Sequence, residues 1–321
     1  MLAPLLATFQ LPGNVASLCL QRKAASRIAV VASDVDGTLL NSRGELSART
    51  AKAIADVQAA GVPFIIATGK CRAGALNALG AVDASVAEQL ASLPGVFTNG
   101  LVVYQAEGNL AWEATLKEET IAAVEAWTDK AQLDYIGYAS GDRLLTTRMT
   151  SRTDELHFVY REPRPEIVPS LQGKRINKIL ILGDPTCLTK GRFLLNGELC
   201  RSGIDVSLTV AMPQMLEVLP PGCSKGDGLK RLLELEGLAD APLMSMGDAE
   251  NDLGMLRMSA TGVAMANAAG PDVIAAARGV QTLSNDDDGA ALALEALLSV
   301  GFDRVKFEQV LTGGFLGTKA S

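Results

Sequence analysis

The chain has 321 residues, 48% hydrophobic and 20% charged, which is enough for one large α/β domain carrying a smaller second one. Its net charge of −7 and aromatic content of 4% argue against a surface for nucleic-acid phosphates or for base stacking. With one histidine, His157, zinc sites built from two histidines are excluded, which leaves carboxylate, lysine and hydroxyl chemistry. No apolar run is long enough to span a membrane.

The five cysteines are scattered without a C-x-x-C spacing, which indicates reduced thiols in a reducing compartment. Residues 1–26 contain no acidic residue, and the positive charges at Arg22 and Lys23 come late. A secretory signal would carry its positive charge first. The stretch is therefore an N-terminal extension that is compatible either with a transit peptide or with an unstructured tail.

The first hundred residues alternate short apolar runs with amphipathic stretches, which predicts parallel strands joined by right-handed helical crossovers. The expected elements are strand 27–33, helix 47–60, strand 62–67, a helical stretch to about 93, and strand 96–97.

In the middle of the chain the regular alternation of strands and helices is lost, which predicts an α+β insert over 101–213. The insert begins with a hairpin over 101–112 that turns at Glu107-Gly108-Asn109. The further elements are helix 117–132, strands within 134–147, strand 178–182, helix 185–196 and strand 205–210.

After the insert, strands and helices alternate again, so the domain that begins the chain also ends it. Strands are expected at 215–220, 242–247, 262–265 and 279–283, and helices at 225–237, 249–258, 270–277 and 287–299. We therefore predict a core domain of 27–100 and 214–301, an inserted domain of 101–213, and a tail of 302–321 whose role the sequence does not indicate.

Two carboxylates follow the first predicted strand. Asp34 and Asp36 are two residues apart in extended chain, so their side chains point the same way, and Gly37 allows a sharp turn after them. Ligands of parallel sheets bind at this end of the strands. Because two close carboxylates repel each other, they predict a bound cation, for which Mg²⁺ suits the oxygen ligands. Taken alone, such a pair is more often a capped turn at the end of a strand.

Three further positions at strand or helix ends carry matching polar groups. They are Thr68, Gly69 and Lys70 after the second strand, Lys225 at the start of a helix, and Asp248, Asn251 and Asp252 after the strand at 242–247. Each one alone is more often a turn residue, a solvated helix start or a cap. Four such groups in order along one α/β frame indicate a single anion- and cation-binding site.

With these motifs, DVDGTLL, IIATGK, TNG, SKGDGL and GDAENDLGML, together with VAMANA and SNDDDGAA, the chain resembles the haloacid dehalogenase (HAD) superfamily of phosphohydrolases. The closest likeness is to the Cof-type branch, type IIB, whose C2B cap is inserted between the second and third motifs. The resemblance covers about residues 28–300. It implies a Rossmann-like, doubly wound parallel sheet with an inserted α+β cap.

The resemblance also implies roles for the site residues. Asp34 would be the nucleophile that forms an aspartyl-phosphate, and Asp36 the general acid and base. The implied ligands of Mg²⁺ are Asp34, the backbone carbonyl of Asp36, and Asp248, with support from Asp252. The implied phosphoryl-binding residues are Thr68, Gly69, Lys225 and Asn251. The residues at the substrate and cap junction are Lys70, Asn99 and Gly100.

The implied activity is a Mg²⁺-dependent phosphatase for a small phosphorylated metabolite, with sugar phosphates as the first choice. The alternatives are a ribitylaminouracil phosphate of the flavin pathway, phosphomutase action, a non-catalytic regulatory module, and an RNA-processing partner. We expect a small-molecule partner, with neither direct nucleic-acid contact nor membrane attachment. The oligomeric state is not indicated.

The chain departs from the Cof-type pattern at two motifs. Lys70 stands where an arginine is more usual. An arginine guanidinium can form two parallel hydrogen bonds to a substrate, whereas the lysine ammonium offers a point charge, so the selectivity for substrates can shift. TNGL replaces the more usual NGA. The ATGK form, SLPGVFTNGLVVY and MLEVLPPGCSKG look closest to the HAD domain of plant and algal plastid proteins, some of which carry a YbeY-like endoribonuclease domain. One histidine cannot form that domain's metal site. The likeness favours the plastid stroma over the cytoplasm.

Three further features remain open in the sequence. His157 lies in the insert among arginines and has either a structural role or a substrate contact. Cys71 and Cys223 lie close in sequence to the lysines of two motifs, which raises redox sensitivity as a hypothesis. The acidic run Asp286–Asp288 either resembles a family feature near the metal or is a solvated loop.

Overall fold

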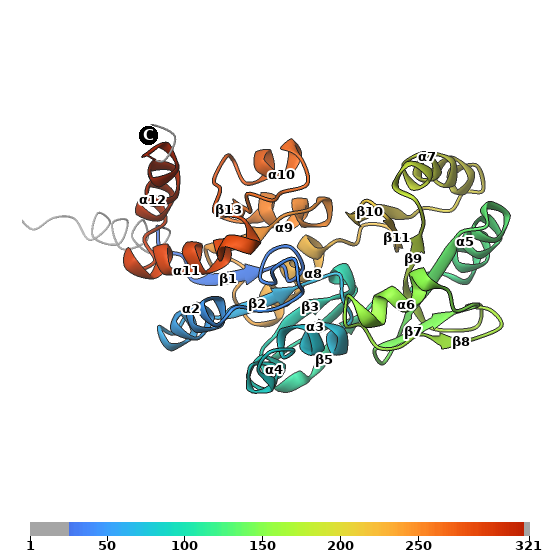
Figure 1. Cartoon of the computed structure of the whole chain (residues 1–321), viewed down its shortest axis with the longest axis horizontal. Helices are drawn as coiled ribbons and strands as arrows, with labels where there is room; N and C mark the ends of the chain where they lie inside the picture. The colour runs from blue at the N-terminus through green and yellow to red at the C-terminus, as the bar shows by residue number, and fades with distance from the viewer. Residues whose placement is uncertain (1–25, 318–321) are drawn as a thin grey trace, which may run out of the picture.

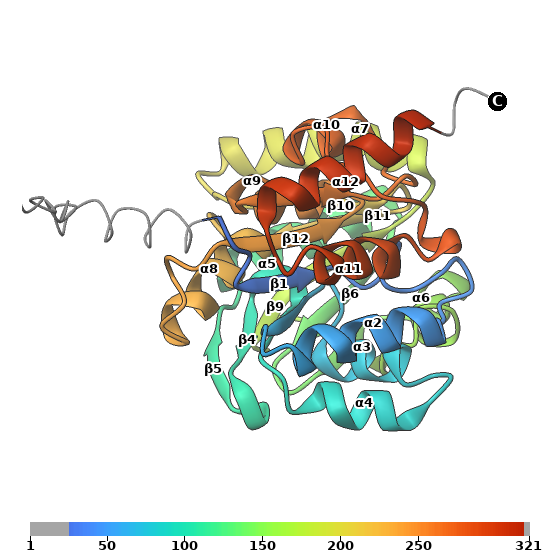
Figure 2. The same cartoon turned by 90° about the vertical axis from the view of Figure 1, so that its left-hand side faces the viewer.

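The computed structural model describes residues 26–317, which form two parts that each have their own β-sheet (Figure 1 and Figure 2). Residues 1–25, most of the predicted extension, lie outside the described residues. The strands of the larger sheet are β1 (Val30–Ser33), β2 (Phe64–Ala67), β3 (Gly95–Phe97), β4 (Val102–Tyr104), β5 (Leu110–Glu113), β12 (Leu243–Gly247) and β13 (Thr261–Ala264).

The larger sheet has the order β13-β12-β1-β2-β3-β4-β5, so the chain winds outward in both directions from β1. β1 pairs in parallel with β2 on one side and with β12 on the other. Ligands of doubly wound sheets bind at such a reversal point, beyond the carboxyl ends of the strands. The predicted fold class is confirmed for this part, which we call the core.

Helices cover both faces of the core sheet because its strands are apolar on both faces. Val30 and Ala32 of β1 pack with the helices of one face, whereas Val31 packs with those of the other. The first face carries α8 (Lys225–Leu235) and α9 (Leu253–Met258). The second carries α2 (Ala48–Ala59), α3 (Arg72–Leu79), α11 (Gly289–Ser299) and α12 (Arg304–Gly317). The remaining core helices are α4 (Ala84–Ala91) and α10 (Pro271–Ala276).

The smaller sheet belongs to the inserted cap and has the order β10-β11-β9-β6-β7-β8. Its strands are β6 (Asp134–Ala139), β7 (Arg143–Thr146), β8 (Glu166–Ile167), β9 (Ile176–Leu182), β10 (Ser207–Met212) and β11 (Met215–Leu219). Two helices, α5 (Glu118–Ala131) and α7 (Pro185–Arg201), cover one face of this sheet. The other face, with α6 (Ser151–Phe158), is turned toward the core (Figure 1).

The strand pairing divides the chain at other points than the predicted boundaries at 101 and 214. The hairpin of β4 and β5 extends the core sheet, because β4 pairs with β3. At the other boundary, β11 pairs with β9 and β10 in the cap sheet. The chain therefore enters the cap after Glu113 and returns to the core after Leu219.

Other differences are local. The helical stretch expected up to about 93 is two helices, α3 and α4, and α6 was not predicted. The strand expected at 279–283 is absent from the described sheets, and Gln281 makes only an isolated bridge to Ala264. Most of the tail forms α12, whose Phe307 is fully buried in the core. Among residues 26–317, no helix is long and apolar enough to cross a membrane.

Candidate active site

The adjacent parallel strands β1 and β12 bring two carboxylates together just beyond their ends. Asp34 follows β1 and donates its backbone N–H to the carbonyl of Met246 in β12 (3.1 Å). One carboxylate oxygen each of Asp34, Asp248 and Asp252 lies within 4.8 Å of the other two. Asp252 comes from the short 3-10 helix η3 (Glu250–Asp252) that follows β12. Strand ends predicted to converge therefore do so.

The turn after Asp36 passes directly over this acidic cluster. Gly37 has a φ of +74°, and a Cβ atom there would lie 2.3 Å from Oδ2 of Asp248. Only glycine fits such a position, for both the backbone angle and the space. Next along the chain, Thr38 donates from its hydroxyl to Oδ1 of Asp248 (3.4 Å).

Lys225 places an ammonium group between two of the carboxylates. Its Nζ atom lies 2.5 Å from Oδ1 of Asp34 and 2.8 Å from Oδ1 of Asp252. The other oxygen of Asp252 accepts the backbone N–H groups of Asp248 (2.9 Å) and Ala249 (3.0 Å). Both oxygens of Asp252 are thus engaged, so this residue positions its neighbours.

Burial makes the charges of this cluster costly. It raises the pKa of Asp34 well above its usual value, against the lowering effect of Lys225, and raises that of Asp248 to about 7, with Asp252 adding to both. Burial lowers the pKa of Lys225, but Asp252 and Asp34 outweigh it and hold that pKa above its usual value. Three carboxylates against one ammonium leave an excess of negative charge among hard oxygen ligands, a donor set that fits Mg²⁺.

Asp36 points away from the cluster and toward the cap. Its Oδ1 atom forms an ion pair with Nζ of Lys70 (3.2 Å), and Lys70 also donates to the backbone carbonyl of Tyr160 in the cap. Burial lowers the pKa of Lys70, but Asp36 and Glu162 outweigh this effect and raise it. Lys70 therefore holds Asp36 at the edge between core and cap.

The end of β2 and the turn after β3 complete the core side of the site. Thr68 is fully buried, and its hydroxyl oxygen accepts the backbone N–H of Lys70 (3.2 Å). Gly100 has a φ of +91°, and a Cβ atom there would lie 2.0 Å from the carbonyl oxygen of Ser224, the N-cap of α8. The absence of a side chain at Gly100 lets this turn approach the helix that carries Lys225.

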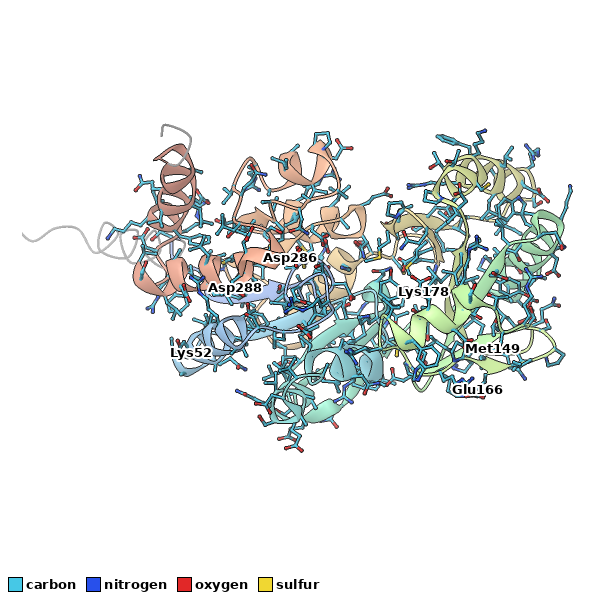
Figure 3. The ribbon with its side chains drawn as sticks, viewed as in Figure 1. Lys52, Met149, Glu166, Lys178, Asp286 and Asp288 are labelled. Carbon is cyan, nitrogen blue, oxygen red and sulfur yellow. The ribbon has the colours of Figure 1, made fainter. Side chains whose placement is uncertain are left out.

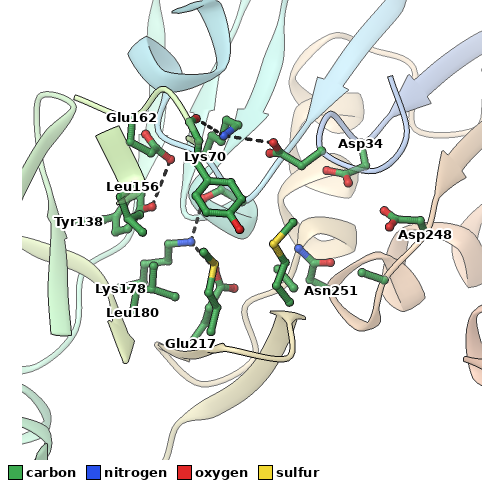
Figure 4. A pocket seen from close by; sticks show the side chains of 17 residues that line it. Asp34, Lys70, Tyr138, Leu156, Glu162, Lys178, Leu180, Glu217, Asp248 and Asn251 are labelled. Carbon is green, nitrogen blue, oxygen red and sulfur yellow. Dashed lines mark hydrogen bonds and ion pairs between the residues drawn. The ribbon is translucent and has the colours of Figure 1, made fainter. Parts of the chain in front are cut away.

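A pocket lies between this core surface and the face of the cap sheet that is turned toward the core (Figure 4). The core side contributes six predicted residues, namely Asp34, Asp36, Gly69, Lys70, Asp248 and Asn251. The cap side contributes apolar and charged residues that were not predicted, including Tyr138, Tyr160, Glu162, Lys178, Met212 and Glu217. Thr68, Lys225 and Asp252 lie behind the core wall.

Two of the missed residues form a buried ion pair on the pocket face of the cap. Lys178 of β9 and Glu217 of β11 are both almost fully buried, with 2.6 Å between Nζ and Oε1. Nζ of Lys178 also donates to the carbonyl of Gly69 (2.8 Å) and lies 4.3 Å from the centre of the Tyr138 ring. Figure 3 shows Lys178 where the two parts meet. The only sign of this pair in the sequence is that each of these two apolar strands contains a single charged residue.

The features left open in the sequence lie outside the acidic cluster. Nδ1 of His157 is 2.8 Å from the backbone oxygen of Glu162, so its contact is structural. Cys71 is buried with its Sγ 2.9 Å from Oε2 of Glu162, and burial raises the pKa of both thiols, Cys71 and Cys223, against the redox hypothesis. Asp286 accepts the backbone N–H of Ser42 (2.7 Å) in an exposed loop of the core.

The sequence profile of the haloacid dehalogenase-like hydrolases matches residues 31–294. The chain belongs to this family. The match agrees with the geometry and confirms the resemblance on which the expectation of a HAD-type phosphoric monoester hydrolase was based.

The chain is also similar to individual curated proteins and solved structures. A chloroplastic YBEY endoribonuclease of Arabidopsis thaliana is 34% identical over 81% of the chain, which spans only 45% of that relative's length. An HMP-PP phosphatase of Citrobacter koseri is 28% identical over 77% of the chain and 86% of the relative. A crystal structure of a haloacid dehalogenase-like hydrolase from Bacteroides thetaiotaomicron has a TM-score of 0.70 and 26% identity, covering 84% of this chain and all of that one.

Proposed function

We propose that the chain is a Mg²⁺-dependent phosphatase that hydrolyses a small phosphorylated metabolite through an aspartyl-phosphate on Asp34. The observation that carries the proposal is Asp34, which lines the pocket between core and cap and is held from behind by Lys225, itself paired with Asp252. The family assignment and the named phosphatase among the relatives support the same activity.

Asp34 suits the role of nucleophile because one of its oxygens is held by Lys225, which orients the carboxylate. In the first step, a carboxylate oxygen of Asp34 forms a bond to phosphorus while the ester oxygen leaves. Lys225, fixed between Asp34 and Asp252, offsets negative charge that develops on the phosphoryl group. The hydroxyl of Thr68 and the backbone N–H groups near Gly69 are further candidate donors to that group.

Asp36 suits the role of general acid and base because Lys70 holds it at the pocket side of the nucleophile. Its proton goes to the leaving ester oxygen in the first step. In the second step it takes a proton from the water that attacks phosphorus, and the bond to Asp34 breaks. A side chain that gives and then regains one proton balances the two steps.

The metal site would comprise Asp34, the backbone carbonyl of Asp36, and Asp248, with Asp252 acting through its hydrogen bonds. When bound, Mg²⁺ would supply positive charge against the carboxylates and the phosphoryl oxygens.

The cap restricts the substrate to small molecules, because its residues line the same pocket as Asp36 and Asn251. A phosphate on a folded protein would find this surface covered. Sugar phosphates are the first candidates, and a ribitylaminouracil phosphate is the alternative because the pocket also has apolar lining from Leu156, Leu180 and Met215.

The test measures phosphate release from sugar phosphates, nucleotides and flavin precursors, with Mg²⁺ or with EDTA. We expect turnover that needs Mg²⁺ and that Asp34→Asn abolishes. The matched control is Asp56→Asn, which removes an exposed carboxylate paired with Lys52 and should leave turnover unchanged. Absence of turnover on every substrate, with Mg²⁺ still bound, would favour the non-catalytic regulatory module.

For the location, the plastid stroma is our proposal and the cytoplasm the alternative. The 34% identity to a relative named chloroplastic supports the plastid. Expression in plant cells as a fusion that carries a fluorescent protein at the C-terminus tests it. Fluorescence in plastids supports the proposal, and diffuse cytoplasmic fluorescence contradicts it.

A further inference from the structure

Four buried polar side chains form one hydrogen-bonded series from the cap into the core. Lys178 is paired with Glu217, whose Oε2 atom accepts a hydrogen bond from the side-chain N–H of Asn99. Oδ1 of Asn99 in turn accepts one from Nδ2 of Asn251 (3.1 Å). We call Lys178, Glu217, Asn99 and Asn251 the relay.

The direction of every bond in the relay is set by Glu217. A carboxylate has no hydrogen to donate, so Asn99 must turn its amide nitrogen toward it. The oxygen of Asn99 then faces Asn251, which must donate through its own nitrogen. Lys178 pairs with the other oxygen of Glu217 inside the protein, 2.6 Å from Oε1.

The last member of the relay is left with an unpaired acceptor. Asn251 is only 8% exposed and lines the pocket, and its Oδ1 atom is buried with no hydrogen-bond partner among the described residues. Figure 4 shows it between the Lys178–Glu217 pair and Asp248. A phosphoryl oxygen cannot satisfy this atom because it is itself an acceptor. A hydrogen-bond donor, such as a hydroxyl group of a ligand or a water molecule, satisfies it.

We propose that Asn251 is a specificity-determining residue whose Oδ1 atom accepts a hydrogen bond from a hydroxyl group of the substrate, with Glu217 and Asn99 as positioning residues. The inference rests on the proposed phosphatase function and narrows its substrates to monoesters with a hydroxyl close to the ester. A substrate without that hydroxyl leaves the buried oxygen unpaired, and sites of this kind discriminate against such analogues.

The test compares two probes that differ by one hydroxyl, 2-hydroxypropyl phosphate and propyl phosphate, by the ratio of their kcat/KM values. For the wild type we expect a preference of about tenfold for the hydroxylated ester, the size of one hydrogen bond. Asn251→Leu should bring the ratio close to one. Glu217→Gln should lower it severalfold, because an amide at 217 can also donate, so Asn99 is free to turn over.

The matched control is Glu125→Gln, which changes another buried carboxylate of the cap. Glu125 lies on α5, accepts hydrogen bonds from Tyr135 and Leu171, and should leave the ratio unchanged. Thermal unfolding of each variant verifies that it is folded.

Equal kcat/KM values of the wild type for the two probes would overturn the inference while leaving the phosphatase function intact. So would an equal loss on both probes in Asn251→Leu, which would assign Asn251 to the phosphoryl group or to a water molecule. Hydrolysis of neither probe nor of any substrate in the wider panel would instead overturn the proposed function itself.

Discussion

The core and the cap both bury charge in the same pocket, but they balance it differently. In the core, Asp34, Asp248 and Asp252 share one ammonium group, that of Lys225. In the cap, Lys178 and Glu217 form a pair that is balanced within itself. The core wall therefore carries an excess of negative charge, whereas the cap wall does not.

Removing the ammonium of the core should have the largest effect. Lys225→Met leaves the buried carboxylates of Asp34 and Asp252 without their counter-ion and should lower the free energy of unfolding in Mg²⁺-free buffer by about 3–5 kcal/mol. Urea denaturation measures the change, and adding Mg²⁺ should restore part of it. The control Lys52→Met, at an exposed ion pair, should cost at most about 0.5 kcal/mol. Equal midpoints for the two variants would show that the core charges are not coupled.

The cap pair should be replaceable as a unit, unlike the core cluster. Lys178→Met alone should lower the free energy of unfolding by about 3 kcal/mol because it leaves Glu217 unpaired. The double variant Lys178→Met/Glu217→Leu should return to within about 1 kcal/mol of the wild type. A double variant less stable than the single one would contradict a balanced pair.

Backbone contact between the turn after β3 and α8 can be tested with glycine substitutions. Gly100→Ala combines a positive φ with a clash on the carbonyl of Ser224 and should cost about 2–3 kcal/mol. Gly61→Ala has a φ of +79° and no atom within 4 Å, so it should cost about 1 kcal/mol. Chemical denaturation compares them, and equal costs would mean that α8 moves away freely.

The smallest effect is expected from the thiols. Iodoacetamide should modify the exposed Cys187 and Cys200 of the native protein but not Cys71, because burial raises the pKa of the Cys71 thiol. Peptide mass spectrometry measures the modification, and phosphate release should be unchanged. In denaturing urea Cys71 should react as well. Native-state labelling of Cys71 would indicate that the cap moves away from the core in solution.

The core side of the site could be predicted because local chain geometry determines it. Asp34, Thr68 and Asp248 each follow a buried parallel strand. The carboxyl ends of parallel strands lie at the same edge of a sheet, whatever the details of side-chain packing. Gly37 marked the turn for the same local reason. These positions needed only the sequence spacing and the period of the strands.

The cap side could not be predicted because its contacts join distant segments. Lys178 meets Glu217 only after β9 pairs with β11, and Glu217 meets Asn99 only after the cap packs on the core. The hairpin over 101–112 was predicted as a hairpin, but which sheet it joins depends on the exposed edge of β3. Strand propensity does not determine which strands pair, because that depends on tertiary packing.

The order of the strands also has a consequence for biosynthesis. The neighbours of β1 in the finished sheet are β2, made soon after it, and β12, made only after the whole cap. A nascent chain that has emerged as far as Leu219 already holds every strand of the cap sheet but lacks Lys225, Asp248 and Asp252. Domains generally fold as units during synthesis. The cap can thus fold on the ribosome before the last third of the polypeptide completes the acidic cluster around Asp34.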